Sequence, residues 1–341
     1  MKCRAFITGV SGPELSAAER EFTRLERPWG FILFRRNIQT PDQVIRLVRE
    51  LREAMGNPEA PVLIDQEGGR VQRLGPPHWP VYPPGAVFGV LYDIDPALGL
   101  AAARLSARLI AADLIELGVT VDCLPLADVP VAGADAVIGN RAYGTEPAKV
   151  AAIARAVTEG LELGGVLPVL KHIPGHGRAT ADTHFRLPEV DTSKAELERT
   201  DFAAFQPLAD LPMAMTAHVV FSALDPAQPA TTSATIIQQV IRGVIGFQGL
   251  LMSDDVSMNA LAGSIAERTR AIVTAGCDVV LHCNGDLGEM REVARETPVL
   301  SGKALDRAKR ALASRKAPQP FDRMAARAEL DELVGRAGVS A

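Results

Sequence analysis

Eight short apolar runs rich in Val, Ile and Leu alternate along this 341-residue chain with stretches of helical periodicity. Such runs are typical of strands in a parallel sheet, because helices cover both faces of that sheet. The predicted strands cover residues 5–8, 30–34, 62–65, 119–124, 166–171, 213–217, 250–253 and 279–282. The predicted helices include residues 41–55, 98–117, 146–163, 193–209, 233–245, 264–275 and 285–296.

Eight strand and helix units in succession predict an α/β fold, a single (β/α)8 barrel of the TIM type. A doubly wound open sheet is the alternative. No linker divides the chain, so residues 1–315 are expected to form one catalytic barrel. Pro318 and Pro320 precede helical patterning in residues 316–341, which predicts a helical C-terminal tail packed on or extending from the barrel.

Composition narrows the classes of function. With 36 Lys and Arg against 41 Asp and Glu, the formal net charge is −5, which gives no electrostatic reason to expect nucleic acid as a partner. Charged residues interrupt the most apolar long stretch, 98–121, so we expect no membrane span. The four cysteines have neither C-x-x-C nor disulfide-scaffold spacing, and no signal peptide is evident. We therefore expect a cytoplasmic monomer that binds a small molecule.

Polar residues gather where the predicted strands end, which is the edge that carries the active site of such barrels. The fifth strand opens the segment 171–177 (KHIPGHG), and Asp182 and His184 follow it. Lys171 and His172 would cost free energy at the end of a buried strand without partners, so a ligand is expected there. A carboxylate such as Asp182 can orient His184 for general acid and base catalysis.

Two further loops carry arginines beside glycines. Segment 65–73 (DQEGGRVQR) follows the third strand, and its carboxylates and arginines, including Asp65 and Arg73, could bind a polyhydroxylated ligand. A charged loop that makes only its own ion pairs is the alternative. Arg141, in segment 139–144 (GNRAYG), is suited to binding an anion or hydroxyl groups.

The seventh strand ends in Ser253, Asp254 and Asp255. Adjacent residues on a strand point to opposite sides, so we expect Asp254 to face the barrel mouth and Asp255 to brace the loop. A carboxylate opposite an acid/base group makes the geometry of a retaining glycosidase available.

A metal-dependent barrel hydrolase is an alternative, because His172, His176, Asp182 and His184 are potential ligands. However, the first strand lacks the H-x-H pair of barrel metallohydrolases, and no H-E-x-x-H helix is present. We therefore expect no metal and no cofactor. A non-catalytic sugar-binding barrel is the remaining alternative.

Four motifs together resemble those of the bacterial β-N-acetylglucosaminidases of glycoside hydrolase family 3, which act in peptidoglycan recycling. The K-H-F-P-G-H-G segment with its D-T-H appears at 171–177 and 182–184, with Ile173 in place of Phe. D-Q-E-G-G-R-V-Q-R is intact at 65–73, and S-D-D lies at 253–255. The I-G-D-R-S-F-G loop appears as IGNRAYG at 138–144, with Asn140 in place of Asp.

This resemblance implies a retaining exo-β-N-acetylglucosaminidase that removes non-reducing GlcNAc from GlcNAc-1,6-anhydroMurNAc muropeptides. It makes Asp254 the nucleophile of a covalent glycosyl-enzyme and His184 the general acid/base, oriented by Asp182. It also implies that five residues bind the hydroxyls and the N-acetyl group of the sugar: Asp65, Arg73, Arg141, Lys171 and His172. Ile173 and Asn140 depart from the family pattern beside these positions and affect fine preference rather than the reaction.

Overall fold

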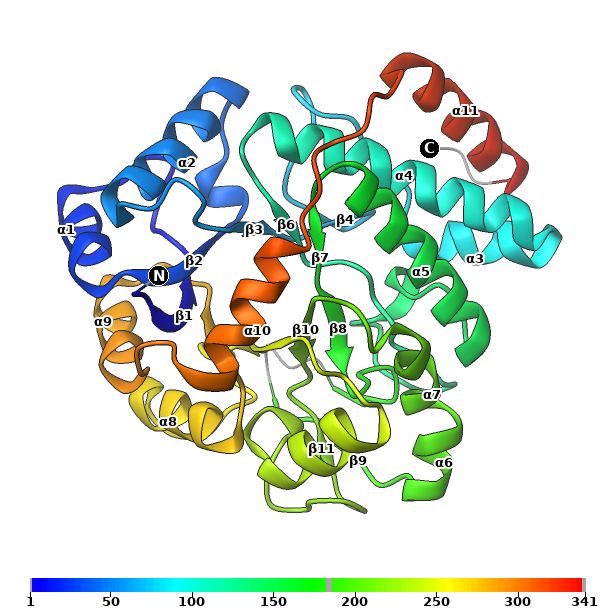
Figure 1. Cartoon of the computed structure of the whole chain (residues 1–341). Coiled ribbons are helices and arrows are strands. Elements are labelled where there is room, and N and C mark those ends of the chain that lie inside the picture. The colour runs from blue at the N-terminus through cyan, green and yellow to red at the C-terminus, as the bar shows by residue number, and fades with distance from the viewer. Residues whose placement is uncertain (1, 182–185, 339–341) are drawn as a thin grey trace.

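The computed structural model of the chain describes residues 2–181 and 186–338. Its main sheet is parallel and has the strand order β7-β6-β3-β2-β1-β13-β12-β10-β8. Because β7 (Leu167–Pro168) and β8 (Leu170–Ile173) belong to one chain segment, the sheet begins and ends on the same segment and closes into a barrel. Helices surround this ring of strands (Figure 1). The predicted (β/α)8 barrel is confirmed, and the open sheet is excluded.

The remaining barrel strands lie on the predicted apolar runs. They are β1 (Arg4–Thr8), β2 (Pro28–Leu33), β3 (Val62–Ile64), β6 (Val121–Asp122), β10 (Met213–Thr216), β12 (Leu250–Asp255) and β13 (Val279–His282). Two small pairs lie outside the barrel sheet: β4 (Gln66–Gly68) with β5 (Val71–Gln72), and β9 (Glu189–Val190) with β11 (Val220–Phe221). All eight predicted strands are confirmed, and the fifth is split at Val169.

Most predicted helices are also present. The α-helices are α1 (Ala17–Glu26), α2 (Pro41–Met55), α3 (Gly85–Ile94), α4 (Pro96–Glu116), α5 (Pro147–Leu163), α6 (Lys194–Arg199), α7 (Asp201–Phe205), α8 (Ile265–Ala275), α9 (Leu287–Glu296), α10 (Gly302–Ala313) and α11 (Arg323–Arg336). The predicted helix 193–209 is broken at Thr200 into α6, α7 and the 3-10 turn η3 (Gln206–Leu208). The predicted helix 233–245 is a π-helix, η5 (Ile236–Val244). Three further 3-10 turns are η1 (Arg35–Asn37), η2 (Gly139–Arg141) and η4 (Ala230–Thr232).

Local sequence explains where the helices begin and end. The hydroxyl of Thr40 accepts a hydrogen bond from the backbone N–H of Gln43, and Pro41 occupies the first position of α2. Gly56 ends α2 with a φ of 65°, a conformation that glycine adopts without steric cost. Ser264 and Glu267 form a capping box at the start of α8.

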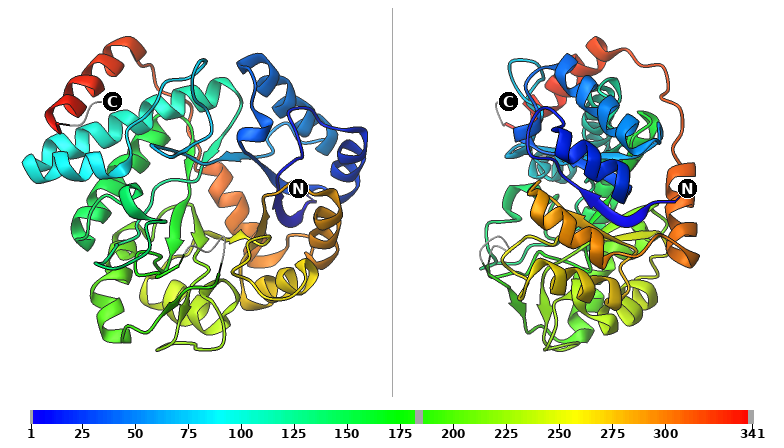
Figure 2. Two further views of the ribbon diagram at one scale, coloured as in Figure 1. Left: turned by 180° about the vertical axis from the view of Figure 1, so that it is seen from behind. Right: turned by 90° about the vertical axis from the view of Figure 1, so that its left-hand side faces the viewer.

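The tail packs on the outside of the barrel against α4 (Figure 1). Leu330 and Val334 of α11 are buried there, and Arg323 forms ion pairs with Asp113 and Glu116 of α4. Helix α10 lies across the opposite end of the barrel from the strand ends that carry the acids (Figure 2). The helical tail is present as predicted, while a domain boundary at residue 315 stays a prediction. In the described part of the chain, no helix is both long and apolar enough to cross a membrane.

Candidate active site

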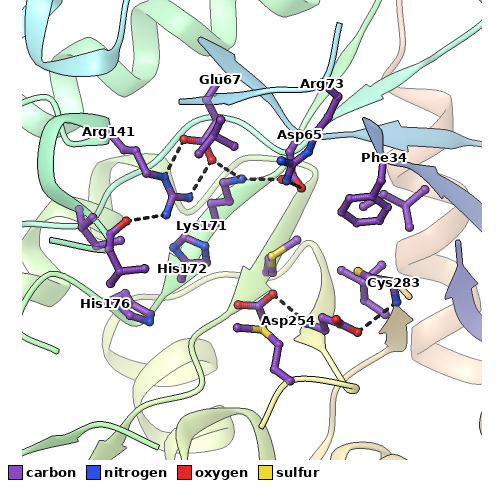
Figure 3. A pocket seen from close by; sticks show the side chains of 18 of the residues that line it. Phe34, Asp65, Glu67, Arg73, Arg141, Lys171, His172, His176, Asp254 and Cys283 are labelled. Atoms are coloured by element: carbon purple, nitrogen blue, oxygen red, sulfur yellow. Dashed lines mark hydrogen bonds and ion pairs between the residues drawn. The ribbon is translucent and has the colours of Figure 1, made fainter. Parts of the chain in front are cut away.

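A pocket of about 320 Å3 opens at the C-terminal ends of the barrel strands (Figure 3), within the range of about 300–1,000 Å3 that is usual for small-ligand sites. Acids, bases and a few apolar side chains share its wall. Its lining residues include Phe34, Asp65, Glu67, Arg70, Arg73, Arg141, Lys171, His172, His176, Met215, Asp254, Asp255, Met258 and Cys283. The wall is therefore rich in hydrogen-bonding groups and suited to a polar ligand.

Asp65 directly follows β3 and binds two cations. Its carboxylate accepts hydrogen bonds from Lys171 Nζ at 2.9 Å and from Arg73 Nη2 at 3.0 Å. Burial on its own would raise the pKa of Asp65, but the charges of Lys171 and Arg73 outweigh burial and hold the pKa well below its usual range. Asp65 is therefore ionised at neutral pH and is fixed in position by both partners.

Glu67 lies two residues further along the extended chain and joins the same network. It accepts hydrogen bonds from Arg141 through both carboxylate oxygens, at 2.9 and 2.8 Å, and its Oε1 is 2.7 Å from Lys171 Nζ. Burial opposes ionisation of Glu67, but Lys171 and Arg141 outweigh burial and lower its pKa to about 2. Burial would lower the pKa of Lys171, yet the charges of Asp65 and Glu67 raise it above its usual value. The network is thus a fully ionised cluster of two acids and three bases.

The hairpin of β4 and β5 presents these acids through tight backbone packing. The side-chain oxygen of Gln66 accepts hydrogen bonds from the backbone N–H groups of Arg73 and Leu74, each at 2.9 Å. Gly68 has a φ of 97°, and a Cβ there would overlap the carbonyl oxygen of Pro83. The glycine in this segment is therefore required by the fold, and it allows the hairpin to turn beside the pocket.

His172, in β8, and His176, in the loop that follows, line one side of the pocket, and Asp128 contacts both residues. Asp128 lies 2.8 Å from His172 Nδ1 and accepts from the backbone N–H of His176 at 2.7 Å. Burial acts to raise the pKa of Asp128, but His172 outweighs it and the pKa is lowered. Because an ionised carboxylate only accepts, Nδ1 of His172 carries a proton and Nε2 is left for the pocket.

His176 is held in the neutral form. Burial, together with the neighbouring His172, lowers the pKa of His176 to about 4. A Cβ at the next residue, Gly177, would overlap the carbonyl oxygen of Val129, so this loop packs too closely for any larger side chain. His176 therefore shapes the pocket wall and supplies neutral imidazole surface at pH 7.

Asp254 lies across the pocket from the ion network, at the end of β12 (Figure 3). Burial would raise its pKa, but the nearby His218 and His172, together with the backbone N–H of Asp255, lower the pKa below its usual value. Asp255 faces its own loop and accepts hydrogen bonds from Ser257 Oγ at 2.6 Å and from the backbone N–H of Cys283 at 3.0 Å. Asp254 is thus an ionised carboxylate free of ion-pair partners among the described residues, while Asp255 braces the loop as expected.

The structure brings six of the predicted site residues into one pocket: Asp65, Arg73, Arg141, Lys171, His172 and Asp254. Asp182 and His184 lie outside the described residues. Sequence reasoning did not assign a role to Glu67 or Asp128. Glu67 could have been found because residues i and i+2 of an extended strand share a face, which places it beside Asp65. Nothing local to Asp128 indicates that it contacts His172, 44 residues away.

This arrangement places a network of fixed donors and acceptors across the pocket from the ionised carboxylate of Asp254. Such a pocket can hold a polyhydroxylated ring by its oxygens and present Asp254 to one face of it. Within residues 2–181 and 186–338, no group of three or more His, Cys, Asp or Glu side chains is placed to hold a metal ion.

Comparisons with known proteins agree on one family. The glycosyl hydrolase family 3 N-terminal domain matches residues 15–313. A β-hexosaminidase of Alkalilimnicola ehrlichii is 40% identical over 282 residues, covering 82% of this chain and 80% of that protein. A β-hexosaminidase of Bordetella avium is 34% identical over 92% of this chain and 89% of its own length.

Solved structures of the same kind superpose over nearly the whole chain. NagZ from Neisseria gonorrhoeae in complex with N-trifluoroacetyl-D-glucosamine matches with a TM-score of 0.88 and 32% identity, over 98% of this chain and 99% of that one. The same Neisseria protein in complex with a zinc ion matches with a TM-score of 0.87 and 31% identity, over 98% of this chain and 99% of that one.

Proposed function

Because the chain belongs to glycosyl hydrolase family 3, we propose that its pocket cleaves terminal β-linked GlcNAc through a covalent bond to Asp254. The enzyme is a glycoside hydrolase of the β-N-acetylhexosaminidase class. The proposal adds the residues, the retaining stereochemistry and the natural substrate, which is the GlcNAc-1,6-anhydroMurNAc muropeptide of cytoplasmic cell-wall recycling.

The observation that carries the proposal is the placement of Asp254. It is ionised, lies in the pocket, and faces the buried network of Asp65, Glu67, Lys171 and Arg141 (Figure 3). Attack on the anomeric carbon needs the carboxylate form, and that form is available at neutral pH. Because Asp65, Arg73, Arg141, Lys171 and His172 already have fixed orientations, they can bind the sugar hydroxyls and the N-acetyl group with little loss of conformational freedom. The compound bound to the Neisseria protein, N-trifluoroacetyl-D-glucosamine, is also a glucosamine with an N-acyl group.

In this mechanism His184 protonates the leaving oxygen and then removes a proton from the attacking water, and Asp182 orients its imidazole. An imidazole with its ordinary pKa of about 6.5 can donate and recover a proton near pH 7 without large tuning. Both residues lie in the segment outside the described structure, so their roles rest on the family motif.

The direct test uses a 5-fluoro N-acetylglucosaminyl donor, which slows turnover of the covalent intermediate. We expect peptide mapping by mass spectrometry to find the sugar on the peptide that contains Asp254. A label on another residue, or no label while the donor is still turned over, would refute the nucleophile assignment. The Asp254→Asn variant is the matched control and should remain unlabelled.

The substrate is tested separately by comparing a muropeptide with GlcNAc disaccharides that lack the anhydro sugar. We expect release of free GlcNAc, and formation of a sugar 1-phosphate in added phosphate would instead show phosphorolysis.

A chelator is expected to leave activity unchanged. Loss on chelation, restored by zinc, would favour the metal-dependent hydrolase, and binding of GlcNAc without turnover would favour the sugar-binding barrel.

A further inference from the structure

The acids at the end of β12 lie just beyond its regular pairing with β10. That pairing joins Met213, Ala214 and Met215 to residues 250–252. Past this point the side chains of Thr216 and His218 make the contacts. The backbone N–H of Asp254 donates to Thr216 Oγ1 at 3.3 Å, and His218 Nε2 lies 2.9 Å from the carbonyl oxygen of Asp255. Both ends of the dipeptide of Asp254 and Asp255 are therefore held by side chains.

Thr231 connects the two side chains into one cluster. Its Oγ1 is 2.8 Å from Thr216 Oγ1, 2.8 Å from His218 Nδ1 and 2.9 Å from the carbonyl oxygen of Ala217. Thr216, Thr231 and His218, which we name the Thr–Thr–His cluster, are fully buried at 0% exposure. None of these three residues lines the pocket, whereas Asp254 and Asp255 do. The cluster therefore acts on a bound substrate through the end of β12.

The hydrogen-bond partners of the cluster set the direction of the contact between His218 Nε2 and Asp255, whether the imidazole is neutral or a cation. If the single hydroxyl proton of Thr231 goes to His218 Nδ1, the imidazole is neutral and its other proton is on Nε2. If that proton goes to the Ala217 carbonyl or to Thr216 Oγ1, Nδ1 must itself donate and the imidazole is a cation. Because a carbonyl oxygen only accepts, Nε2 donates to Asp255 in both cases.

We propose that the Thr–Thr–His cluster positions the nucleophile, with His218 as its central positioning residue. It takes over on the β10 side, where the pairing of β12 with β10 ends at Met252 while the pairing with β13 continues to Asp255, so the Asp254 carboxylate keeps one direction relative to the bound sugar. This inference rests on the proposed function, since it takes Asp254 as the attacking group. A displacement of the attacking atom by about 1 Å can lower the rate roughly 100-fold.

The test separates the two ends of the His218 ring. An Asn side chain places its amide near the position of Nδ1 and keeps the contact to Thr231, while a Gln side chain reaches the position of Nε2 and keeps the donor to Asp255. We expect His218→Asn to lower kcat by about 10- to 100-fold with KM nearly unchanged, because positioning acts in the transition state. His218→Gln is expected to retain most of the activity.

The hydroxyl end of the cluster has its own matched set. Thr216→Val removes the acceptor of the Asp254 N–H and is expected to lower kcat, whereas Thr216→Ser restores the oxygen and the rate. Thr269→Val is the control for loss of a buried hydroxyl, because Thr269 in α8 is also 0% exposed and donates only to the Ile265 carbonyl at 2.7 Å. Its kcat should equal that of the wild type.

A pH profile adds a readout that simple destabilisation would not move. The groups facing Asp254 are His172, His176, His218 and the neighbouring Asp255 and Cys283. Because His218 is one of the groups that lower the pKa of Asp254, the acid limb of kcat/KM is expected to move to higher pH in His218→Asn. In Thr269→Val the acid limb should stay in place.

Equal losses in His218→Asn and His218→Gln, or in Thr216→Val and Thr269→Val, would overturn the inference. Wild-type kcat in His218→Asn would do so as well. Asp254→Asn is measured in parallel. If it keeps wild-type activity, the proposed function fails; if it is inactive while the His218 and Thr216 variants are unaffected, only the positioning role fails.

Discussion

Replacement of Glu67 by Gln tests how the buried ion network is stabilised. The side chain of Glu67 is 4% exposed, is hydrogen bonded to Arg141 and forms an ion pair with Lys171. Its pKa is lowered from 4.5 to about 2, against the effect of burial, by Lys171 and Arg141. A change of this size corresponds to roughly 3 kcal/mol of folding free energy. In Glu67→Gln the neutral amide leaves Arg141 without a carboxylate ion-pair partner among the described residues and leaves Lys171 with Asp65 alone, so we expect the free energy of unfolding to fall by about 3 kcal/mol.

The sign of the pH dependence follows from the lowered pKa. The contribution of an ionised Glu67 is fully present above its unfolded pKa of about 4.5 and is lost as pH falls towards 2. The difference between wild type and Glu67→Gln should therefore be the same at pH 7 and pH 5, and should shrink only below about pH 4.5.

Urea unfolding followed by circular dichroism measures this difference. Glu159→Gln is the matched control, because Glu159 pairs with Arg104 at the surface, where the side chains are 44% and 42% exposed. We expect less than about 1 kcal/mol for that exposed pair. A loss in Glu67→Gln no larger than in Glu159→Gln would show that the network contributes little to stability and would refute the reasoning.

Three further predictions concern the acid/base, the histidine support and the tail. His184→Ala should severely reduce kcat/KM on substrates with poor leaving groups but only mildly on activated aryl glycosides, since those need little protonation; equal losses would exclude the acid role. Asp128→Asn should raise KM about 10-fold or more, because His172 loses a charged hydrogen bond of 2.8 Å, and an unchanged KM would contradict this. Leu330→Ala, at a side chain 1% exposed, should lower the free energy of unfolding by about 2–4 kcal/mol with kcat/KM unchanged; a parallel loss of activity would show that the tail supports the pocket.

Elements with strong local signals were predictable. Helix α2 matches its predicted range, because Thr40, Pro41 and Gly56 mark its ends. Helix α1 was not among the predicted helices, although the capping box of Ser16 and Glu19 marks its start. Helix α3 has no such signal, because its sequence is apolar on most sides and no side chain caps its first turn.

Two helices could not be predicted in detail, because apolar periodicity does not show a break inside a helix or the type of its hydrogen bonding. The Thr200 hydroxyl donates to the Glu196 carbonyl at 2.7 Å and lies 2.8 Å from Asp201 Oδ2, at the point where α6 ends and α7 begins. The hydrogen bonding of η5 is π-helical, and periodicity of hydrophobic residues does not distinguish a π-helix from an α-helix.

The sequence by itself determined the barrel and the edge at which its polar residues gather, because apolar periodicity and strand-end residues are local properties of the chain. It also placed Asp254, Lys171 and His172 at strand ends. Only the tertiary structure decided which charges meet. Glu67 pairs with Arg141, which is 74 residues away in sequence, and Asp65 pairs with Lys171, which is 106 residues away. Those pairings depend on the order β7-β6-β3 in the sheet, which brings strand ends far apart in sequence together in a buried site where their charges fix one another's ionisation.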